Sequence, residues 1–436
     1  MRLIAFIFFC SFVMASAATV YVLDGGVGAG TSWTDALDDL PATLVRGNLY
    51  YLGDGTYASR NFNAASSGTT TIEIRKATVA DHGTSTGWAD SYGDGQAVTA
   101  DDWTITGGDY WIINGNRGDY FTATPYGIKI VNPVDDNRWS LNCNGGGNMS
   151  LFTGLELAGP GDSTTFYDYD ASSTGFTAWT GSTNSMLSNC WVHGHSTLLD
   201  GLSYFVWSRN VLQDSIGQTD PYMGHPTAHC NILYLGFGAH DSVFENNYCA
   251  NYNAEGILVT SYNGCPYNII IRGNVMHNTG PVVGYIDFPR GIEFYNGFSF
   301  TNFQIYNNSF GTNVGIAINE NSATLYSSWA SNNIAIGTSF SFGSIPNGSN
   351  VTVSGSQPFT QPINGTNANY RLAATKPAAN LGITWKDWDG TTVGGDGQWN
   401  LGAFDFTDSG GGGSTTYRGF QFGSGVRLIG PGRIGQ

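Results

Sequence analysis

Charged residues are scarce in this sequence: they make up 11% of its 436 residues, against about a quarter in an ordinary soluble domain. Basic residues are fewer than acidic ones, with 17 Lys and Arg against 33 Asp and Glu, so the formal net charge is −16. Proteins that bind nucleic acid or anionic membranes through charge need basic patches. The composition therefore argues against nucleic acid as a partner.

Long apolar runs are lacking beyond the first residues. The start reads MRLIAFIFFCSFVMASA, with Arg2 as a positive end, an apolar stretch from Leu3 to Met14 and small residues at 15–17. This is typical of a secretory signal peptide over residues 1–17, and the run is too short to span a bilayer comfortably. No later segment predicts a membrane span, so we expect a secreted, periplasmic or cell-surface protein.

Cysteine is rare, and five residues of this type follow residue 17. No CxxC pair or Cys/His spacing predicts a zinc site. In an oxidising compartment one or two disulfides are expected, with at least one thiol left over. The pairs we predict are Cys249–Cys265 and Cys190–Cys230, and buried thiols are the alternative.

The sequence is rich instead in residues that favour strands and turns, including 61 Gly, 23 Tyr and 25 Phe. Low charge with many β-formers, and with Gly and Asn between them, predicts a large all-β protein. The length is sufficient for a sizeable core, in one elongated domain or two compact ones.

A short phrase built around asparagine recurs along the chain. An apolar residue, a polar residue and Asn lead into another apolar position, which predicts a strand edge with a bend, because Asn tolerates left-handed backbone. Stacked asparagines can also hydrogen-bond one another in ladders. The copies are LSNCWV (187–192), WSRNVL (207–212), FENNYC (244–249), IRGNVM (271–276), IYNNSF (305–310) and ASNNIAI (330–336).

A second phrase, Gly-apolar-any-apolar, precedes many of these copies at variable intervals. Variable insertions on a fixed core phrase favour a solenoid whose loops leave from one side, over a β-sandwich. The copies are GLELA (154–158), GLSYFV (201–206), GILVT (256–260), GIEFY (291–295) and GIAIN (315–319). Alternation predicts an inward stack of Leu202, Ile257, Ile292 and Ile316, followed by Val206, Val259, Phe294 and Ile318.

The start of the mature chain predicts a short capping helix. The segment TSWTDALDDLP (31–41) has apolar residues at helical spacing and Ser32 or Thr34 as N-cap. Such a helix would cover the open end of the first coil. The apolar residues are Trp33, Ala36, Leu37 and Leu40.

These features resemble the right-handed parallel β-helix, pectin-lyase-like superfamily. The resemblance covers the opening VYVLDGGVGAGTSWTDALDDLP with RGNLYYLGDGTY (20–57), the Asn-phased coils and the close YRLAATKPAANLG, DWDG, DGQWNLGAFDF (370–406). The close is similar to the family's last coil, with Lys376 for Ser, Leu401 for Ile and Asp405 for Glu. The resemblance implies an all-β right-handed parallel β-helix, a fold that hosts lyases, hydrolases, epimerases, viral spikes and adhesins.

We therefore divide the chain into six parts, of which the last is a tail with three arginines and no acidic residue. The tail, Tyr417 to Gln436, is expected to dock to a surface or to other subunits, or to be disordered. The parts are a signal peptide (1–17), an N-terminal cap and first coil (18–60), β-helix coils (61–345), C-terminal coils and cap (346–406), a Gly-rich linker (407–416) and the tail (417–436).

Ionisable residues precede several glycines of the second phrase. If the phrases stack, the residues directly before the glycines form a row, which is Asp200, Cys230, Glu255, Arg290 and Val314. Outward positions on the same strands add Glu293, Tyr295 and Phe205. Further candidates close by in sequence are His193, His229 and Arg272.

The functional interpretation is a polysaccharide site along this face. In β-elimination a base removes the proton next to a uronate carboxylate while that carboxylate is neutralised. Arg290 or Arg272 would grip the carboxylate, or act as base in the manner of the family. Asp200 and Glu255 would hold Ca²⁺, an ion that prefers oxygen ligands.

A glycoside hydrolase would use Asp200 and Glu255 as acid and base or nucleophile, with His193 or His229 relaying protons. The substrate contacts we predict are Tyr295, Glu293, Phe205 and Trp179; the last lies in an aromatic insertion whose flat rings suit sugars. The family's lyase pattern of aspartates on neighbouring coils and the paired aspartates of polygalacturonases are not reproduced.

Two hypotheses follow. The first is a secreted lyase that cleaves an acidic extracellular polysaccharide. The second is a non-catalytic glycan-binding, adhesin or spike-like protein, in which the charged residues are solvated turn residues that merely pair with their neighbours. Convergence of Asp200, Glu255 and Arg290 in a groove would favour the enzyme, and side chains that splay outward singly would favour the binder.

Overall fold

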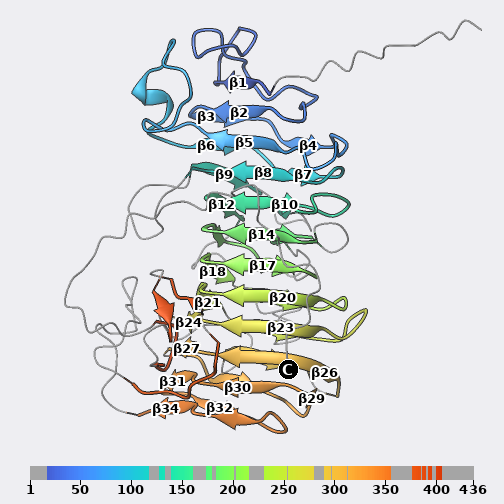
Figure 1. The fold of residues 1–436 in the computed structure, drawn as a ribbon, viewed down its shortest axis with the longest axis vertical. Helices are drawn as coiled ribbons and strands as arrows, with labels where there is room; N and C mark the ends of the chain where they lie inside the picture. Colours follow the sequence, from blue (N-terminus) through green and yellow to red (C-terminus); the bar gives the residue numbers. More distant parts are fainter. Residues whose placement is uncertain are drawn as a thin grey trace, which may run out of the picture.

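The computed structural model shows a solenoid of short stacked strands that runs from β1 at one end to β34 at the other (Figure 1). Every strand pair of its three long sheets is parallel, so the predicted right-handed parallel β-helix is confirmed. The residues that the structure describes are 17–116, 127–132, 139–160, 173–178, 183–200, 203–215, 230–252, 254–278, 289–295, 297–311, 313–354, 376–383, 385–388, 391–394 and 399–404.

Most coils contribute one strand to each sheet, in the chain order A, B, C. Sheet A contains β1 (Thr19–Val22), β2 (Leu49–Leu52), β5 (Ile72–Lys76), β8 (Trp111–Asn114), β11 (Leu151–Thr153), β14 (Ser185–Ser188), β17 (Phe205–Ser208), β20 (His240–Glu245), β23 (Tyr267–Arg272), β26 (Ser299–Tyr306), β29 (Thr324–Tyr326), β30 (Trp329–Ser331) and β33 (Asn347–Gly348). Sheet B contains β3 (Gly55–Tyr57), β6 (Ala97–Thr99), β9 (Ile128–Val131), β12 (Leu155–Ala158), β15 (Trp191–His193), β18 (Val211–Ser215), β21 (Tyr248–Tyr252), β24 (Val275–His277), β27 (Ser309–Phe310), β31 (Ile334–Ile336) and β34 (Val351–Val353).

Sheet C carries the candidate site. Its strands are β4 (Arg60–Phe62), β7 (Trp103–Ile105), β10 (Trp139–Asn142), β13 (Thr174–Thr177), β16 (Thr197–Asp200), β19 (Leu233–Leu235), β22 (Glu255–Val259), β25 (Arg290–Phe294), β28 (Ile316–Asn319) and β32 (Ser339–Ser341). Aliphatic and aromatic side chains from all three sheets fill one continuous core. Within the described part of the chain, no helix is long and apolar enough to cross a membrane.

The asparagine phrase marks one corner of the solenoid, where each strand of sheet A turns into sheet B. Six residues stack there as an Asn ladder, in which each Nδ2 donates to the Oδ1 of the next coil at 2.8–3.0 Å. Each Oδ1 that receives this bond also accepts the backbone N–H of the donating Asn. The ladder consists of Asn210, Asn247, Asn274, Asn308, Asn333 and Asn350, and it confirms the predicted stacking.

The second phrase does not mark a single sheet. GLELA forms β12 in sheet B and the end of GLSYFV begins β17 in sheet A, while only the last three copies lie in sheet C. Ile257 pairs with Ile292 as predicted, but Ile292 pairs with Ile318 rather than Ile316. An inward-outward alternation is common to the strands of all three sheets, and it therefore cannot identify the sheet.

The predicted capping helix over residues 31–41 is wrong, because this segment forms turns and a bridge from Leu37 to Val22. The Asp35 carboxylate accepts bonds from the Ala29 N–H at 3.0 Å and the Thr31 hydroxyl at 2.7 Å. Such local side-chain bonds compete with helix formation. Trp33 is still buried, in a cluster on the outer face of sheet A that also contains Tyr21 and Tyr51.

Neither predicted disulfide forms, and the five described cysteines make no disulfide bond with one another. Cys249 points into the core from β21, while Cys265 is exposed in the connection from β22 to β23. Cys190 and Cys230 are buried beside strands of different sheets, β15 and β19. Burial raises the pKa of the Cys190 thiol to about 12, which makes it unreactive.

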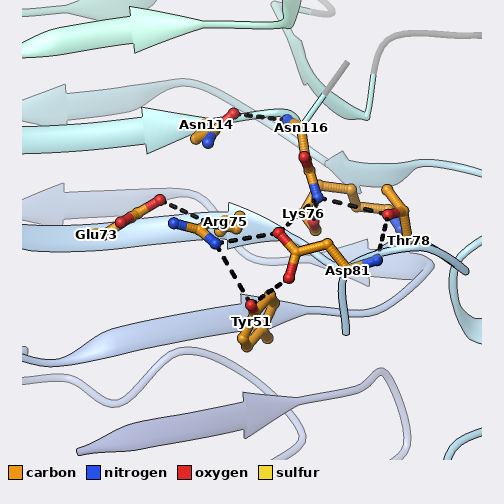
Figure 2. Close-up of polar contacts among 8 residues, drawn as sticks. All are labelled: Tyr51, Glu73, Arg75, Lys76, Thr78, Asp81, Asn114 and Asn116. Carbon is orange, nitrogen blue, oxygen red and sulfur yellow. Dashed lines mark hydrogen bonds and ion pairs between the residues drawn. The ribbon is translucent and has the colours of Figure 1, made fainter. Parts of the chain in front are cut away.

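An excursion over residues 77–96, which contains the 3-10 helix η1 (Asp90–Tyr92), folds back on the outer face of sheet A. Figure 2 shows its anchor, the Asp81 carboxylate, which accepts bonds from the Tyr51 hydroxyl on β2 and from Arg75 Nη1 on β5 at 3.0 Å. Asn116 donates to the same carboxylate at 3.3 Å. Burial, followed by the contact with Asp81, raises the pKa of Tyr51 to about 12.

A segment that we call the strap, the described residues within 376–404, runs along the outer side of several coils and contains the antiparallel strands β35 (Trp385–Lys386) and β36 (Thr392–Val393). Trp385 and Trp399 pack with Tyr306 on sheet A. Leu401 and Phe404 pack against outward aliphatic residues of sheet B.

The first Asn of each Asn-Asn pair holds the strap. Asn246, Asn307 and Asn332 all have left-handed φ values of 54–58°. Their amides donate outward to strap carbonyls: Asn246 to Lys386, Asn307 to Asn400 and Gly402, and Asn332 to Ala379. The two residues of a pair therefore have separate tasks, one inside the corner and one outside it.

We expect Asn307→Gly to loosen the strap without disturbing the coils. Glycine adopts the positive φ without strain. The variant loses two hydrogen bonds to strap carbonyls, and this loss should destabilise the docked strap by about 1–3 kcal/mol. Hydrogen exchange of the Leu401 and Ala403 amides should become faster. Asn302→Gly is the control. Asn302 also has a left-handed φ, of 55°, but its amide donates to Asn268 on the neighbouring coil and not to the strap. Unchanged strap exchange in Asn307→Gly would contradict the role.

Candidate functional site

Three neighbouring strands of sheet C, β22, β25 and β28, bring charged and amide side chains together outside the core. Their apolar residues face inward, and Ile257, Ile292 and Ile318 stack in register. The same register pairs Glu255 with Arg290, the first residues of β22 and β25. The predicted neighbourhood of these two residues is therefore confirmed.

Arg290 lies between two carboxylates. Its Nη1 is 3.6 Å from Glu255 Oε1 and 3.1 Å from Glu293 Oε1. The Arg290 side chain is 29% exposed, whereas that of Glu293 is 1% exposed. The guanidinium is thus the part of the cluster that faces solvent, and the carboxylates hold it from beneath.

Amide side chains complete the cluster. Asn319 Nδ2 donates to one oxygen of Glu293 at 2.6 Å and Asn321 Nδ2 to the other at 2.7 Å. Asn231 Nδ2 donates to Glu255 Oε2 at 2.9 Å. These positions were not predicted from the sequence, although Asn319 and Asn321 flank Glu320 in the polar run NENS that ends a strand phrase.

Burial is the main influence on Glu293 and raises the pKa of its carboxyl to about 7, with a smaller contribution from Glu255. Arg290 and the two asparagine amides oppose this shift. A carboxyl group with a pKa near neutrality can both accept and release a proton under ordinary conditions. The cluster therefore has a proton-transfer group beside an exposed cation.

Asp200 does not join the predicted row. It pairs with Tyr234, which pairs with Leu258, which pairs with Glu293. Asp200 thus lies in the same register row as Glu293, and its strand β16 is three strands away from β25 in sheet C. The reason is that Asp200 is the last residue of its strand, whereas the prediction placed it directly before a strand. Glu255 and Arg290 are confirmed as row neighbours, and the inclusion of Asp200 in their row is wrong.

Two other predicted residues lie on sheet A. Arg272 binds Glu245 through Nε at 2.8 Å and donates to the Tyr306 hydroxyl, with its guanidinium over the Trp385 ring of the strap. Phe205 was expected to face outward, but it is buried in the core and packs against Phe176. The alternation along β17 starts inward at this residue, so the orientation we predicted for Phe205 is wrong.

His193 belongs to a separate cluster on the outer face of sheet B. Its Nε2 is 3.2 Å from Glu156, which also binds Lys129 at 2.7 Å and Gln96 at 2.9 Å. These three hydrogen-bonding partners outweigh burial and lower the pKa of Glu156 to about 2. Trp191 stacks on the His193 ring. Glu156 thus forms an ion pair with Lys129 and a hydrogen bond with His193, on a different sheet from Arg290.

Among the remaining predicted residues, Tyr295 follows β25 and is exposed. His229 and Trp179, together with the signal peptide up to residue 16, the Gly-rich linker and the tail, lie outside the described residues.

No group of three or more His, Cys, Asp or Glu side chains converges as a metal site among the residues that the structure describes. Glu255 is bound by Asn231 and Arg290, and Asp200 lies in a different row. This pair does not fit the several oxygen ligands that Ca²⁺ requires. Calcium binding stays a prediction, and we derive no chemical step through it.

The class of protein that the fold defines is a right-handed parallel β-helix. No protein-family model matches the chain, and no curated protein sequence is similar to it. Among solved structures it is similar to pectate lyase Pel9A, with 14% identity over 90% of this chain and 97% of that chain and a TM-score of 0.54. An alginate lyase from Paenibacillus sp. str. FPU-7 is 15% identical over 77% of this chain and 99% of its own, with a TM-score of 0.43. At this identity the first likeness shows a shared fold.

Proposed function

We propose that this protein is an extracellular polysaccharide lyase that cleaves a uronate-containing glycan by β-elimination. The observation that supports the proposal is the position of Arg290, an exposed guanidinium held by Glu255 and Glu293 on the outer face of sheet C. The fold is shared with a pectate lyase, and the signal-peptide pattern of residues 1–17 predicts export.

In this proposal Arg290 binds the uronate carboxylate. A guanidinium matches a carboxylate with two parallel hydrogen bonds, and it neutralises the charge that opposes removal of the neighbouring proton. Arg290 lies over Glu293. A substrate carboxylate that draws the guanidinium outward therefore uncovers the Glu293 carboxylate at the place where the proton must leave.

Glu293 is then the base. Its carboxylate takes the proton from the carbon next to the uronate carboxylate, and the electron pair forms the new carbon–carbon double bond. The bond to the glycosidic oxygen breaks, and that oxygen takes a proton from water. Glu255, with Asn231 behind it, acts as a positioning residue that holds Arg290 from the neighbouring strand.

The test is a product assay on the secreted protein with polygalacturonate, alginate and other uronate polysaccharides, each with and without Ca²⁺. A lyase produces an ultraviolet-absorbing unsaturated end with every reducing end that it releases. Reducing ends without ultraviolet absorbance would identify a hydrolase instead. Binding of a glycan with no product from any of them would favour the non-catalytic binder.

The proposal also predicts a pH profile. Because only the ionised carboxylate accepts a proton, kcat/KM should rise with pH through an apparent pKa near 7. Asn321→Ala removes a bond that stabilises the ionised form, so the rise should move to higher pH, while Asn302→Ala on sheet A should leave it in place. A profile that falls through this range would contradict Glu293 as base.

The same raised pKa has a consequence for folding. The carboxyl binds its proton more tightly in the folded state than an ordinary glutamate does, whose pKa is 4.5. The contribution of this group to stability is therefore fully present below about pH 4.5 and is lost as the pH rises through about 7. The ionised carboxylate that the reaction requires is therefore the form that burial destabilises.

A further inference from the structure

The exposed tyrosines of the described chain lie on sheet A and on the connections that lead into it from sheet C. Its exposed large apolar side chains are four valines and four tyrosines, and the tyrosines are 40–58% exposed. All four lie on three consecutive coils: two in the connections that lead to β23 and β26, one at the first residue of β23 and one at the last residue of β29 (Figure 1 shows these strands). They are Tyr262, Tyr267, Tyr295 and Tyr326, which we call the tyrosine strip.

Three rings of the strip are held by a second ring. Tyr262 meets Phe237 edge to face at 5.1 Å, and Tyr295 stacks on Phe298 at 6.1 Å. Tyr267 stacks on His240 at 4.7 Å with an interplanar angle of 10°. Side chains that are already ordered lose little conformational entropy when a ligand binds. The strip is therefore a preorganised surface.

Two members of the strip, Tyr267 and Tyr326, lie in one register row along the solenoid axis, two strands apart. Along sheet A, His240 pairs with Tyr267, Tyr267 with Thr301, and Thr301 with Tyr326. Strands in a sheet are about 4.8 Å apart, which is close to the length of one pyranose ring. Successive rings of an extended sugar chain would thus meet successive coils.

We propose that the tyrosine strip binds an extended polysaccharide chain that lies along the solenoid axis. A tyrosine offers a flat apolar face to the C–H face of a sugar ring and a hydroxyl to its polar edge. The strip is continuous with the candidate site, because Tyr295 directly follows β25, the strand that carries Arg290 and Glu293. The inference goes beyond the proposed reaction, since binding here requires no bond to break.

The test uses the full chain with Glu293→Gln, so that no glycan is consumed, in gels that contain polygalacturonate, alginate or hydroxyethyl cellulose. The variants are Tyr262→Ala, Tyr267→Ala, Tyr295→Ala and their triple combination. Each single change should weaken binding about two- to tenfold, and the triple change should abolish retardation. Tyr262→Phe should keep most of the affinity, because it keeps the ring.

The control is Val79→Ala, which removes an exposed apolar side chain at the far end of the solenoid. Equal retardation of the parent and the triple variant, or no retardation of the parent by any of the polysaccharides, would overturn the inference. The inference would also be overturned if the triple change altered the sedimentation coefficient of the protein but not its binding to the glycan. The partner of the strip would then be a second copy of the chain. Cleavage without strip-dependent binding would overturn this inference and leave the proposed reaction standing.

Discussion

Replacing Glu293 with glutamine should reduce glycan cleavage at least about a hundredfold, since a positioned general base contributes about 10²- to 10⁴-fold. The amide has nearly the same shape and can still accept one of the two bonds, from Asn319 or from Asn321, at its single oxygen. It cannot take a proton from carbon. The loss should therefore appear in kcat, with KM nearly unchanged, in the ultraviolet assay on the best glycan of the panel.

Two companion variants separate the roles within the cluster. Arg290→Ala should raise KM as well as lower kcat, because it removes the group that binds the uronate carboxylate. Glu255→Gln should cost less, about tenfold, because Glu255 only positions Arg290 from 3.6 Å. A larger loss in Glu255→Gln than in Glu293→Gln would transfer the role of base to Glu255.

A matched control is available on sheet A. Glu245→Gln removes the same charge from beside an arginine, since Glu245 binds Arg272 at 2.6 Å. It should keep full activity while losing the stability of one ion pair. If Glu245→Gln and Glu293→Gln lose activity together, the loss reflects damage to the coils, and the assignment of Glu293 fails.

The sequence predicts the architecture well because the corner residue is chemically special. Asn combines a tolerance for left-handed backbone with an amide that bonds its own kind. It recurs at the same corner of six consecutive coils, as in Asn246-Asn247 and Asn307-Asn308. The strands carry no such mark, so GLSYFV and GILVT look alike in sequence and lie in different sheets.

The site is predicted less completely, for a related reason. Glu255 and Arg290 are found because each precedes a Gly-Ile strand start. Glu293 was predicted only as a substrate contact, since its raised pKa depends on burial by neighbouring coils. Asn231, Asn319 and Asn321 are placed by register across strands that are 24–28 residues apart in sequence. Register of this kind is set by packing and loop lengths, which no local pattern encodes.

The largest effect on stability is expected at the middle of the Asn ladder. Asn274→Ala removes the side-chain bonds to the Asn247 N–H and to the Phe244 carbonyl in a buried corner. It also removes one of the two bonds at the Asn247 amide and one of the two at the Asn308 Oδ1. Each buried polar group that loses its partner destabilises by about 1–3 kcal/mol. Partial access of water limits the sum, and we expect a decrease of about 3–5 kcal/mol in the free energy of unfolding, measured by denaturant titration.

The end of the ladder supplies the comparison. Asn350→Ala removes the same side chain, but Asn350 is only partly buried and water can replace its bonds to Asn333. The expected loss is about 1 kcal/mol. Because coils stack only on their neighbours, hydrogen exchange in Asn274→Ala should rise first at the amides of Asn247 and Asn274. Equal decreases in the free energy of unfolding for Asn274→Ala and Asn350→Ala would contradict the prediction, because the buried ladder bonds would then add no stability beyond that of partly buried ones.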